Sequence, residues 1–415
     1  MDALEELVAW DCAGQVTELC RELIRIPSEN PPGDVTEMAA RVEGYLNDAG
    51  LPVRRVVSPG GRPSLVAELD FGPGPTLVFN GHLDVVPAGD RNRWSCDPFG
   101  GELRDGYVWG RGASDMKGGL AAQLVALARI ADLPGLRGKL VFMAVPDEET
   151  GGEEGTKLLL EQGVSGDACL IAEPSGLHPT VGQKGNIWLQ ALASGEPAHG
   201  SLSPAAGTNA IPRMCRAIDC LYRLWDIDWQ LPEAARELIF RTQALLRAAG
   251  RHAPAEALGR VSVNVGTIRG GEKVNMVAGQ CEAQFDLRVP IGLPTAQVLA
   301  ELKRLARAEG VEEVELNPLR PPNEANHTPP DHPFVQAVLE SVAQVTGESP
   351  QPTLQWASSD ARFFRYRGIP TVQYGPAELE GIHGYNERVR VQALGQAARV
   401  YAQLACRWLG GSSPR

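Results

Sequence analysis

The chain has 415 residues, of which 43% are hydrophobic and 22% charged, and acidic residues outnumber basic ones by 51 to 39. A chain of this kind buries a large core in two or three domains, and its net charge of −12 argues against nucleic acid or an anionic membrane surface as the main partner. No apolar run approaches the ~18 residues of a membrane span, and the acidic N-terminus does not resemble a signal peptide.

The first part of the chain alternates strand and helix patterns. An apolar helical face runs through residues 14–26 and ends at "PSENPPGD". Strands are predicted at 64–70, 76–80, 139–145 and 168–172, and a helix at 118–133. This alternation predicts an α/β domain with a mixed, mainly parallel sheet.

The pattern changes at residue 185. A strand is predicted at 185–195, a helix whose apolar face includes Ile211, Met214 and Leu221, strands at 260–271 and 281–289, a helix from Thr295 to Gly310, and a strand at 311–319. The order β-α-β-β-α-β is typical of a ferredoxin-like α+β domain, and a polar, Ala-rich insertion lies near 226–258. We therefore expect an inserted domain at 185–320.

The last part of the chain returns to the α/β pattern, with a helix near 334–346, a strand at 369–375 and an amphipathic helix at 391–408. Residues 1–184 and 321–415 are therefore expected to form one domain. The eight cysteines are scattered and form no C-x-x-C pair, so we interpret them as reduced core residues of a cytoplasmic protein.

Ligand-type side chains follow several of these predicted elements. His82 and Asp84 come directly after one strand, Glu148 and Glu149 after another, and Asp115 precedes a helix. Glu173 and His383 follow two further strands. Because ligands of open α/β sheets bind beyond the carboxyl ends of the strands, we expect these side chains to converge on one crevice.

Converging carboxylates repel one another unless a positive charge neutralises them. Two divalent metals would do so, and imidazole together with carboxylate suits zinc. Two His, two Glu and a bridging Asp would hold two metals roughly 3.5–4 Å apart, leaving one Glu as a general base for a shared water.

Each residue alone has a simpler interpretation. A histidine after a strand is more often a surface or capping residue, Asp115 has the position of a helix cap, paired glutamates usually form a solvated face, and Glu173 would be an ordinary strand-end carboxylate. The site hypothesis depends on five element ends that all carry ligand-type residues.

Seven stretches of the chain resemble one protein family. They occur in the same order as in that family and extend over nearly the whole chain: "GHLDVVPAGDRNRWSCDPFGGELRDGYVWGRGASDMKGGLAA", "PDEETGGEEGT", "IAEPS", "HGSLSPAAGTNAI", "GGEKVNMVAGQCEAQFDLR", "SSDARFF" and "HGYNERV". The chain is similar to the di-zinc aminoacylase/carboxypeptidase family of acetylornithine deacetylase, succinyl-diaminopimelate desuccinylase and glutamate carboxypeptidase-like metallohydrolases. The resemblance implies a zinc-exopeptidase-like catalytic domain with an inserted lid and dimerisation domain.

The resemblance also implies roles for the residues of the expected crevice. His82, Asp115 and Glu173 would hold one Zn²⁺, and Asp115, Glu149 and His383 the other, with Co²⁺ or Mn²⁺ as possible substitutes. Glu148 would be the general base that deprotonates the metal-bridged water and then protonates the leaving amine. Asp84 would orient His82 through its other ring nitrogen.

On the substrate side, the resemblance implies that His199 reaches the active site of the partner subunit in a homodimer and steadies the oxyanion. Its simpler interpretation is a histidine in a surface loop. Asn275 and Arg288 match positions at the substrate carboxylate, which a guanidinium grips bidentately, although Arg288 is also explained by an ion pair in a strand. Ser359 and Arg362 match a loop that closes on the substrate.

The expected activity is hydrolysis of the amide bond of a small N-acyl amino acid. An exopeptidase that cleaves dipeptides or a C-terminal glutamate, and a formamide hydrolase of a small heterocycle, remain alternatives within the same chemistry. A non-catalytic small-molecule binding protein is the alternative from another class, and the presence of Glu148 and all five ligand positions argues against it.

Overall fold

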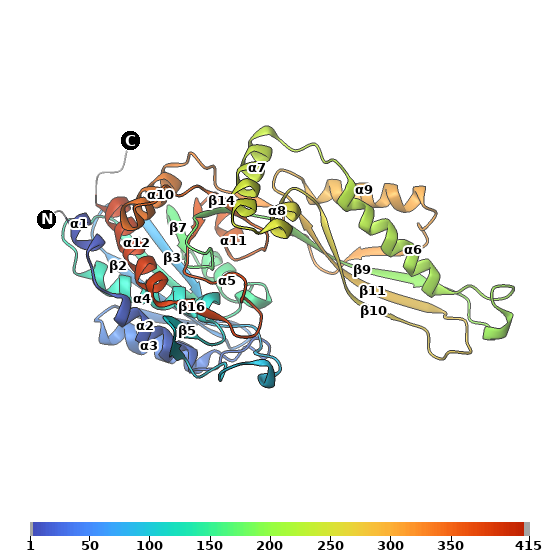
Figure 1. Cartoon of the computed structure of the whole chain (residues 1–415), viewed down its shortest axis with the longest axis horizontal. Coiled ribbons are helices and arrows are strands. Elements are labelled where there is room, and N and C mark those ends of the chain that lie inside the picture. Colours follow the sequence, from blue (N-terminus) through green and yellow to red (C-terminus); the bar gives the residue numbers. More distant parts are fainter. Residues whose placement is uncertain (1–2, 411–415) are drawn as a thin grey trace. The chain divides into compact units, whose positions relative to one another are not determined.

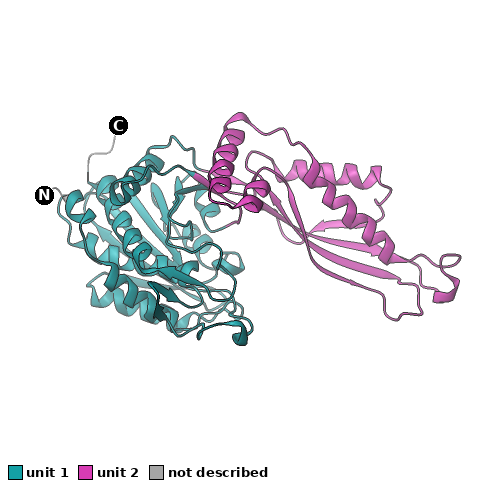
Figure 2. Cartoon of the chain, viewed as in Figure 1, with its two compact units in different colours: residues 1–181, 328–352, 359–415 teal, residues 182–327, 353–358 magenta. Residues whose placement is uncertain are grey.

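The computed structural model describes residues 3–410, and the chain forms two compact units (Figure 2). Unit 1 comprises residues up to 181, 328–352 and those from 359 onward, and unit 2 comprises 182–327 and 353–358. The sequence-based boundaries of the inserted domain, 185 and 320, lie a few residues inside those of unit 2. The short segment 353–358 belongs to unit 2 because the Leu354 N–H donates to Thr242 Oγ1 there, a long-range contact without a local sequence signal.

The main sheet of unit 1 is mixed, with its parallel strands in the middle. The strand order is β1-β2-β6-β3-β7-β15-β8-β13, and β6/β3, β3/β7 and β7/β15 are the parallel pairs. The strands are β1 (Val53–Val57), β2 (Pro63–Asp70), β3 (Thr76–His82), β6 (Lys139–Val145), β7 (Ala168–Ile171), β8 (Thr180–Gln183), β13 (Asn326–His327) and β15 (Thr371–Gln373), and a further strand, β14 (Thr353–Gln355), also pairs with β8. The carboxyl ends of β3, β6, β7 and β15 therefore lie at one edge, which confirms the predicted sheet class.

Helices cover both faces of this sheet, which explains why its central strands are almost continuously apolar (Figure 1). On one face, α4 (Gly118–Ala131) and α12 (Val391–Leu409) pack on each other and on β3, where the Phe79 and Tyr401 rings are 5.9 Å apart. On the other face, α5 (Thr156–Glu161) and α11 (Ala361–Arg365) contribute Leu159 and Phe364 to a second apolar cluster.

Further helices of unit 1 are α1 (Ala3–Val8), α2 (Ala13–Ile24), α3 (Thr36–Asp48) and α10 (Pro333–Thr346). A second, three-stranded sheet has the order β16-β5-β4, with β4 (Glu102–Arg104), β5 (Tyr107–Trp109) and β16 (Arg388–Arg390). Strands of three residues are too short for a periodic pattern, so the sequence did not predict this sheet. It joins the segment before Asp115 to the segment after His383.

Unit 2 has the predicted ferredoxin-like core. Its antiparallel sheet has the order β10-β11-β9-β12, formed by β9 (Gly185–Ser194), β10 (Ser262–Gly270), β11 (Gln280–Val289) and β12 (Glu315–Pro318). Helices α6 (Ala210–Tyr222) and α9 (Thr295–Ala308) share an apolar cluster with one face of this sheet. The insertion, for which no element was predicted, forms α7 (Glu233–Ala248) and α8 (His252–Leu258).

All eight cysteines are free thiols, five of them buried, in line with the absence of paired spacings in the sequence. Within residues 3–410, no helix has both the length and the apolar character that crossing a membrane requires.

Candidate functional site

The ligand-type residues of unit 1 meet at the carboxyl edge of the main sheet. His82 is the last residue of β3, Glu148 and Glu149 lie in a single helical turn (Glu148–Thr150) after β6, and Glu173 lies two residues beyond β7. Asp115 comes from an irregular turn before α4, with φ −126° and ψ 93°, and its peptide bond to Met116 is cis. The residue at the N-cap of α4 is Lys117, so Asp115 is not the helix cap that its sequence position allowed.

Asp115 lies between the two histidines. His82 Nε2 is 3.1 Å from Asp115 Oδ1, and His383 Nε2 is 3.2 Å from Asp115 Oδ2. His383 Nε2 is also 3.3 Å from Glu149 Oε2, and His82 Nε2 is 3.8 Å from Glu173 Oε1. One carboxylate thus faces two imidazoles through its two oxygens, and each imidazole faces a second carboxylate.

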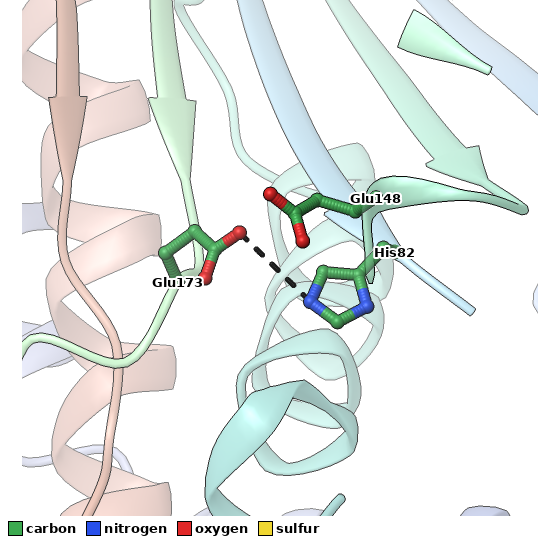
Figure 3. A group of neighbouring side chains, drawn as sticks. All are labelled: His82, Glu148 and Glu173. Carbon is green, nitrogen blue, oxygen red and sulfur yellow. Dashed lines mark ion pairs between the residues drawn. The ribbon is translucent and has the colours of Figure 1, made fainter. Parts of the chain in front are cut away.

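Two overlapping groups of ligand atoms are compact enough to hold a metal ion. His82, Asp115 and Glu149 form one group, and His82, Glu148 and Glu173 form the other (Figure 3); within each group all ligand atoms lie within 4.8 Å of one another. In Figure 3, Glu148 lies beside His82 and Glu173. Glu148 is half-buried there, so the interpretation of Glu148–Glu149 as a solvated face does not hold for Glu148.

Asp84 contacts the other ring nitrogen of His82, mainly through its backbone. His82 Nδ1 is 2.8 Å from the main-chain oxygen of Asp84 and 3.5 Å from its carboxylate Oδ1. The second carboxylate oxygen accepts hydrogen bonds from Asn30 Nδ2, at 2.8 Å, and from the Glu149 N–H, at 3.3 Å. Asp84 therefore links the orientation of His82 to the position of Glu149.

The three glutamates of the site resist ionisation in the metal-free protein. Burial, followed by the charge of Asp115, raises the pKa of Glu173 to about 8. Burial, and then the charges of Glu173 and Asp360, raise the pKa of Glu148 well above its usual range. Burial and the Asp115 charge also raise the pKa of Glu149.

The histidines and the central aspartate shift in the opposite sense. Burial would lower the pKa of His82, but hydrogen bonds to Asp115 and Asp84 and the charge of Glu173 outweigh it and raise that pKa well above its usual value. Hydrogen bonds to Asp115 and Glu149 raise the pKa of His383 to about 10. Burial would raise the pKa of Asp115, but the two histidines outweigh burial and lower it.

This donor set fits divalent metal ions. Glu173 is buried, and its Oε1 atom has no hydrogen-bond partner among the described residues, which is costly for a carboxylate oxygen that nothing else binds. The side chain of His383 is 51% exposed, so the group opens to solvent on that side. Nitrogen and oxygen ligands in this arrangement suit zinc and, with carboxylates in the majority, manganese or cobalt.

Two other predicted site residues of unit 1 are buried among backbone groups. Arg362 donates to the main-chain oxygens of Ser359, at 2.7 Å, and Gly151, at 2.5 Å. The Ser359 hydroxyl accepts a hydrogen bond from Gln373 Nε2 at 2.9 Å. Their predicted contact with substrate stays a prediction.

The remaining predicted residues belong to unit 2. His199 is exposed, and its Nδ1 is 2.7 Å from Ser201 Oγ. The neighbouring Gly200 N–H donates to the main-chain oxygen of Asn275 at 2.8 Å, so the loops that carry His199 and Asn275 are adjacent. Arg288 forms a two-point contact with Asp286 Oδ2, at 2.9 and 2.8 Å.

Sequence reasoning missed several supporting residues. Asn30 donates a hydrogen bond to the Asp84 carboxylate, and Asp360 is buried close enough to Glu148 for its charge to raise the pKa of Glu148. Arg111 and Glu387 form a buried ion pair that contacts the Asp115 backbone. Asp360, Arg111 and Glu387 lie inside the stretches "SSDARFF", "GRGASDMKGG" and "HGYNERV" that carried the family resemblance. That position was the only signal, because nothing in the local pattern shows which distant segments meet.

The chain matches the model of peptidase family M20/M25/M40 over residues 78–407. A succinyl-diaminopimelate desuccinylase from Methylocella silvestris is 31% identical over 415 residues, and the match covers 95% of this chain and 98% of the relative. Both matches extend across units 1 and 2.

Solved structures show the same fold at lower identity. An M20 family metallo-carboxypeptidase from Sulfolobus solfataricus superimposes with a TM-score of 0.77 at 21% identity, covering 94% of this chain and 98% of the other. A protein from Bacillus subtilis described as a dinuclear metal-binding peptidase of the M20 family gives a TM-score of 0.68 at 16% identity, covering 96% and 98%.

Proposed function

The chain belongs to peptidase family M20/M25/M40, whose members are metal-dependent amide hydrolases, and from this premise we propose that it removes a short acyl group, with succinyl as the first candidate, from the amine of a small amino acid. One observation carries the proposal: two histidines from distant segments face the two oxygens of Asp115 in a crevice crowded with carboxylates.

We assign two metal sites that share Asp115. His82, Asp115 and Glu173 would hold one ion, and Asp115, Glu149 and His383 the other. The distances of 3.1–3.8 Å among these atoms support the assignment, because the same atoms draw together around a cation. Zinc is our first candidate for both ions, and Co²⁺ or Mn²⁺ would suit the same oxygen-rich donors.

The residue left for proton transfer is Glu148. When bound, the two ions would supply Lewis acidity to polarise the scissile carbonyl and to lower the pKa of the attacking water. The Glu148 carboxylate accepts a proton from that water and then donates it to the nitrogen of the leaving amine. Water is consumed, the C–N bond breaks, and the products are a carboxylate and a free amine.

Unit 2 would supply the contacts that select the substrate. We assign Arg288 and Asn275 to the carboxylate end of the substrate, and His199 to the developing oxyanion in the partner subunit of a homodimer. The exposure of His199 and the adjacent Asn275 loop support this assignment. In the dimer, unit 2 would form the interface, and the cytoplasm, where thiols stay reduced, would be the compartment.

A substrate panel with zinc-loaded protein tests the function. N-succinyl and N-acetyl amino acids are compared with dipeptides and with folate-like glutamate conjugates. We expect the highest kcat/KM for an N-acyl amino acid. Preferential cleavage of dipeptides would overturn the substrate assignment but keep the amide chemistry. Activity that survives exhaustive chelation would overturn the metal assignment.

A further inference from the structure

A buried ion pair lies against the backbone of the turn that carries Asp115. Arg111 Nη1 is 2.5 Å from Glu387 Oε2, and the two side chains are 2% and 1% exposed. The residues are 276 positions apart and are brought together by the antiparallel pairing of β5 with β16. Burying a charged pair is costly unless further hydrogen bonds satisfy it, so its remaining contacts are informative.

The other carboxylate oxygen of Glu387 fixes the turn that carries Asp115. Glu387 Oε1 accepts the backbone N–H of Ser114 at 2.9 Å and that of Asp115 itself at 3.0 Å. The backbone of Asp115 is not helical, so helix hydrogen bonds do not hold it in place. Glu387 therefore holds the aspartate that faces both histidines.

The Arg111 guanidinium holds two further loops. Its Nη2 donates to the main-chain oxygen of Gly384, at 3.0 Å, directly after His383. The same nitrogen is 3.3 Å from the main-chain oxygen of Pro87, and the neighbouring Val86 N–H donates to Glu149 Oε1 at 3.2 Å. The planar, forked donors of arginine suit such divergent contacts better than the single ammonium of lysine.

These contacts are not distributed evenly between the two proposed metal sites. The Arg111–Glu387 pair hydrogen-bonds to the backbone of Asp115 and of the residue after His383. It reaches Glu149 through the backbone of Pro87 and Val86. His82 is instead part of β3 and is held by the ladder of the main sheet, and Glu173 follows β7 in the same sheet. His383, by contrast, lies in an irregular loop with φ 60°.

We propose that the Arg111–Glu387 pair is a positioning element that holds Asp115, Glu149 and His383 ready for their metal ion before the ion binds. The inference rests on the ligand assignment proposed above. Its consequence is selective: loss of the pair weakens the site that uses His383 more than the site that uses Glu173, although both share Asp115.

The test measures metal binding to the whole metal-free chain. Co²⁺ is titrated against a competing chelator, and its visible absorption reports the ligand geometry of each equivalent. The variants His383→Ala and Glu173→Gln first identify which equivalent belongs to which site. We expect Glu387→Gln and Arg111→Lys to weaken the His383 site about 10–100-fold, the usual range for groups that orient ligands, and to leave the other site much less affected.

A matched control lies three residues after Glu387, at the end of β16. Arg390 pairs with Glu378 at 2.7 Å, and the two side chains are 59% and 29% exposed. Glu378 reaches the turn that carries Asp115 through its backbone N–H, which donates to Ser114 Oγ and which the substitution leaves in place, so Arg390→Gln should bind both ions normally. Equal weakening of both sites in the Glu387→Gln protein, or wild-type affinity at both, would overturn the inference. If the unpaired Arg111 prevents folding, the double variant Arg111→Gln/Glu387→Gln removes that charge and is judged by the same criterion. A wild-type chain that binds fewer than two ions would instead refute the proposed function.

Discussion

Glu148 is the residue whose chemical role is separable from metal binding. It comes from the turn after β6 and lies beside His82 and Glu173, but the proposed ligand sets do not require it. We expect Glu148→Ala to keep two bound ions and to lower kcat by about 10²–10⁴, the usual contribution of a general base. Metal analysis together with steady-state kinetics checks both parts.

The matched control for this variant is Glu153→Ala, because Glu153 is an exposed glutamate nearby whose one ion pair within residues 3–410 is with Lys157. Its activity should equal that of the wild type. Full activity of the Glu148→Ala protein would remove the assigned base, and loss of an ion from that variant would make Glu148 a ligand.

The raised pKa values predict that metal binding releases protons. In the metal-free chain, Glu173 titrates near 8 and His383 near 10, so both carry a proton at pH 7. Their lone pairs bind a cation only after deprotonation, so the apparent affinity should rise as the pH increases from 6 to 9. Calorimetry at pH 7 in two buffers of different ionisation enthalpy measures the released protons.

Comparison with Glu173→Gln gives this measurement a reference, because that variant cannot release the glutamate proton. We expect it to release fewer protons at pH 7 than the wild type. A metal affinity that does not change between pH 6 and pH 8 would contradict the causes assigned to the raised pKa values. These causes are burial and the charge of Asp115 for Glu173, and hydrogen bonds to Asp115 and Glu149 for His383.

At the scale of elements, α4 begins in contact with the segment that carries Glu173. A Cβ atom at Gly119 would lie 2.2 Å from the main-chain oxygen of Ala172, the residue before Glu173. We expect Gly119→Ala to destabilise the protein by about 1–3 kcal/mol and to weaken metal binding, because backbone must move to make room. Denaturant unfolding and metal titration measure the two effects.

Gly44 provides the opposite case in the same unit. It lies inside α3, and a Cβ atom there would meet nothing within 4 Å. Gly44→Ala should therefore stabilise the protein by about 0.5–1 kcal/mol through the lower entropy of the unfolded chain. If Gly119→Ala and Gly44→Ala changed the free energy of unfolding by the same amount, the close approach of α4 to Ala172 would not explain the loss of stability in Gly119→Ala.

The elements also show how much of the fold and site the sequence predicted. Strong periodic segments such as β6, α6 and α12 were predicted within a few residues, and so was the order of the ferredoxin-like core. The sheet of β4, β5 and β16 and the helices α7 and α8 were missed, because three-residue strands and an Ala-rich polar segment carry little periodic signal. The convergence of His82, Asp115 and His383 was predicted, whereas the Arg111–Glu387 pair depends on contacts across 276 positions that no local pattern shows.

For the whole molecule, we predict that metal removal destabilises only one of the two cores. All proposed ligands belong to unit 1, and unit 2 has its own apolar cluster. A ligand present at 100 times its dissociation constant stabilises the folded state by about 2.7 kcal/mol. Hydrogen exchange with and without chelator should show faster exchange in unit 1 and no change in residues 185–318. Uniformly faster exchange in both units would contradict this expectation.

The two points at which the chain passes between unit 1 and the segment 182–327 of unit 2 have a consequence for the deletion or exchange of that segment. Gly182 pairs with His327, and the Thr328 N–H donates to the main-chain oxygen of Val181 at 2.8 Å, so the two crossings are neighbouring antiparallel strands. If residues 182–327 were deleted, the new chain ends, Val181 and Thr328, would be one strand spacing apart, about 4.8 Å. A two-residue hairpin turn closes such a gap, so residues 182–327 could be removed or exchanged as one piece, and residues 353–358 would be the part of unit 2 left in the host chain.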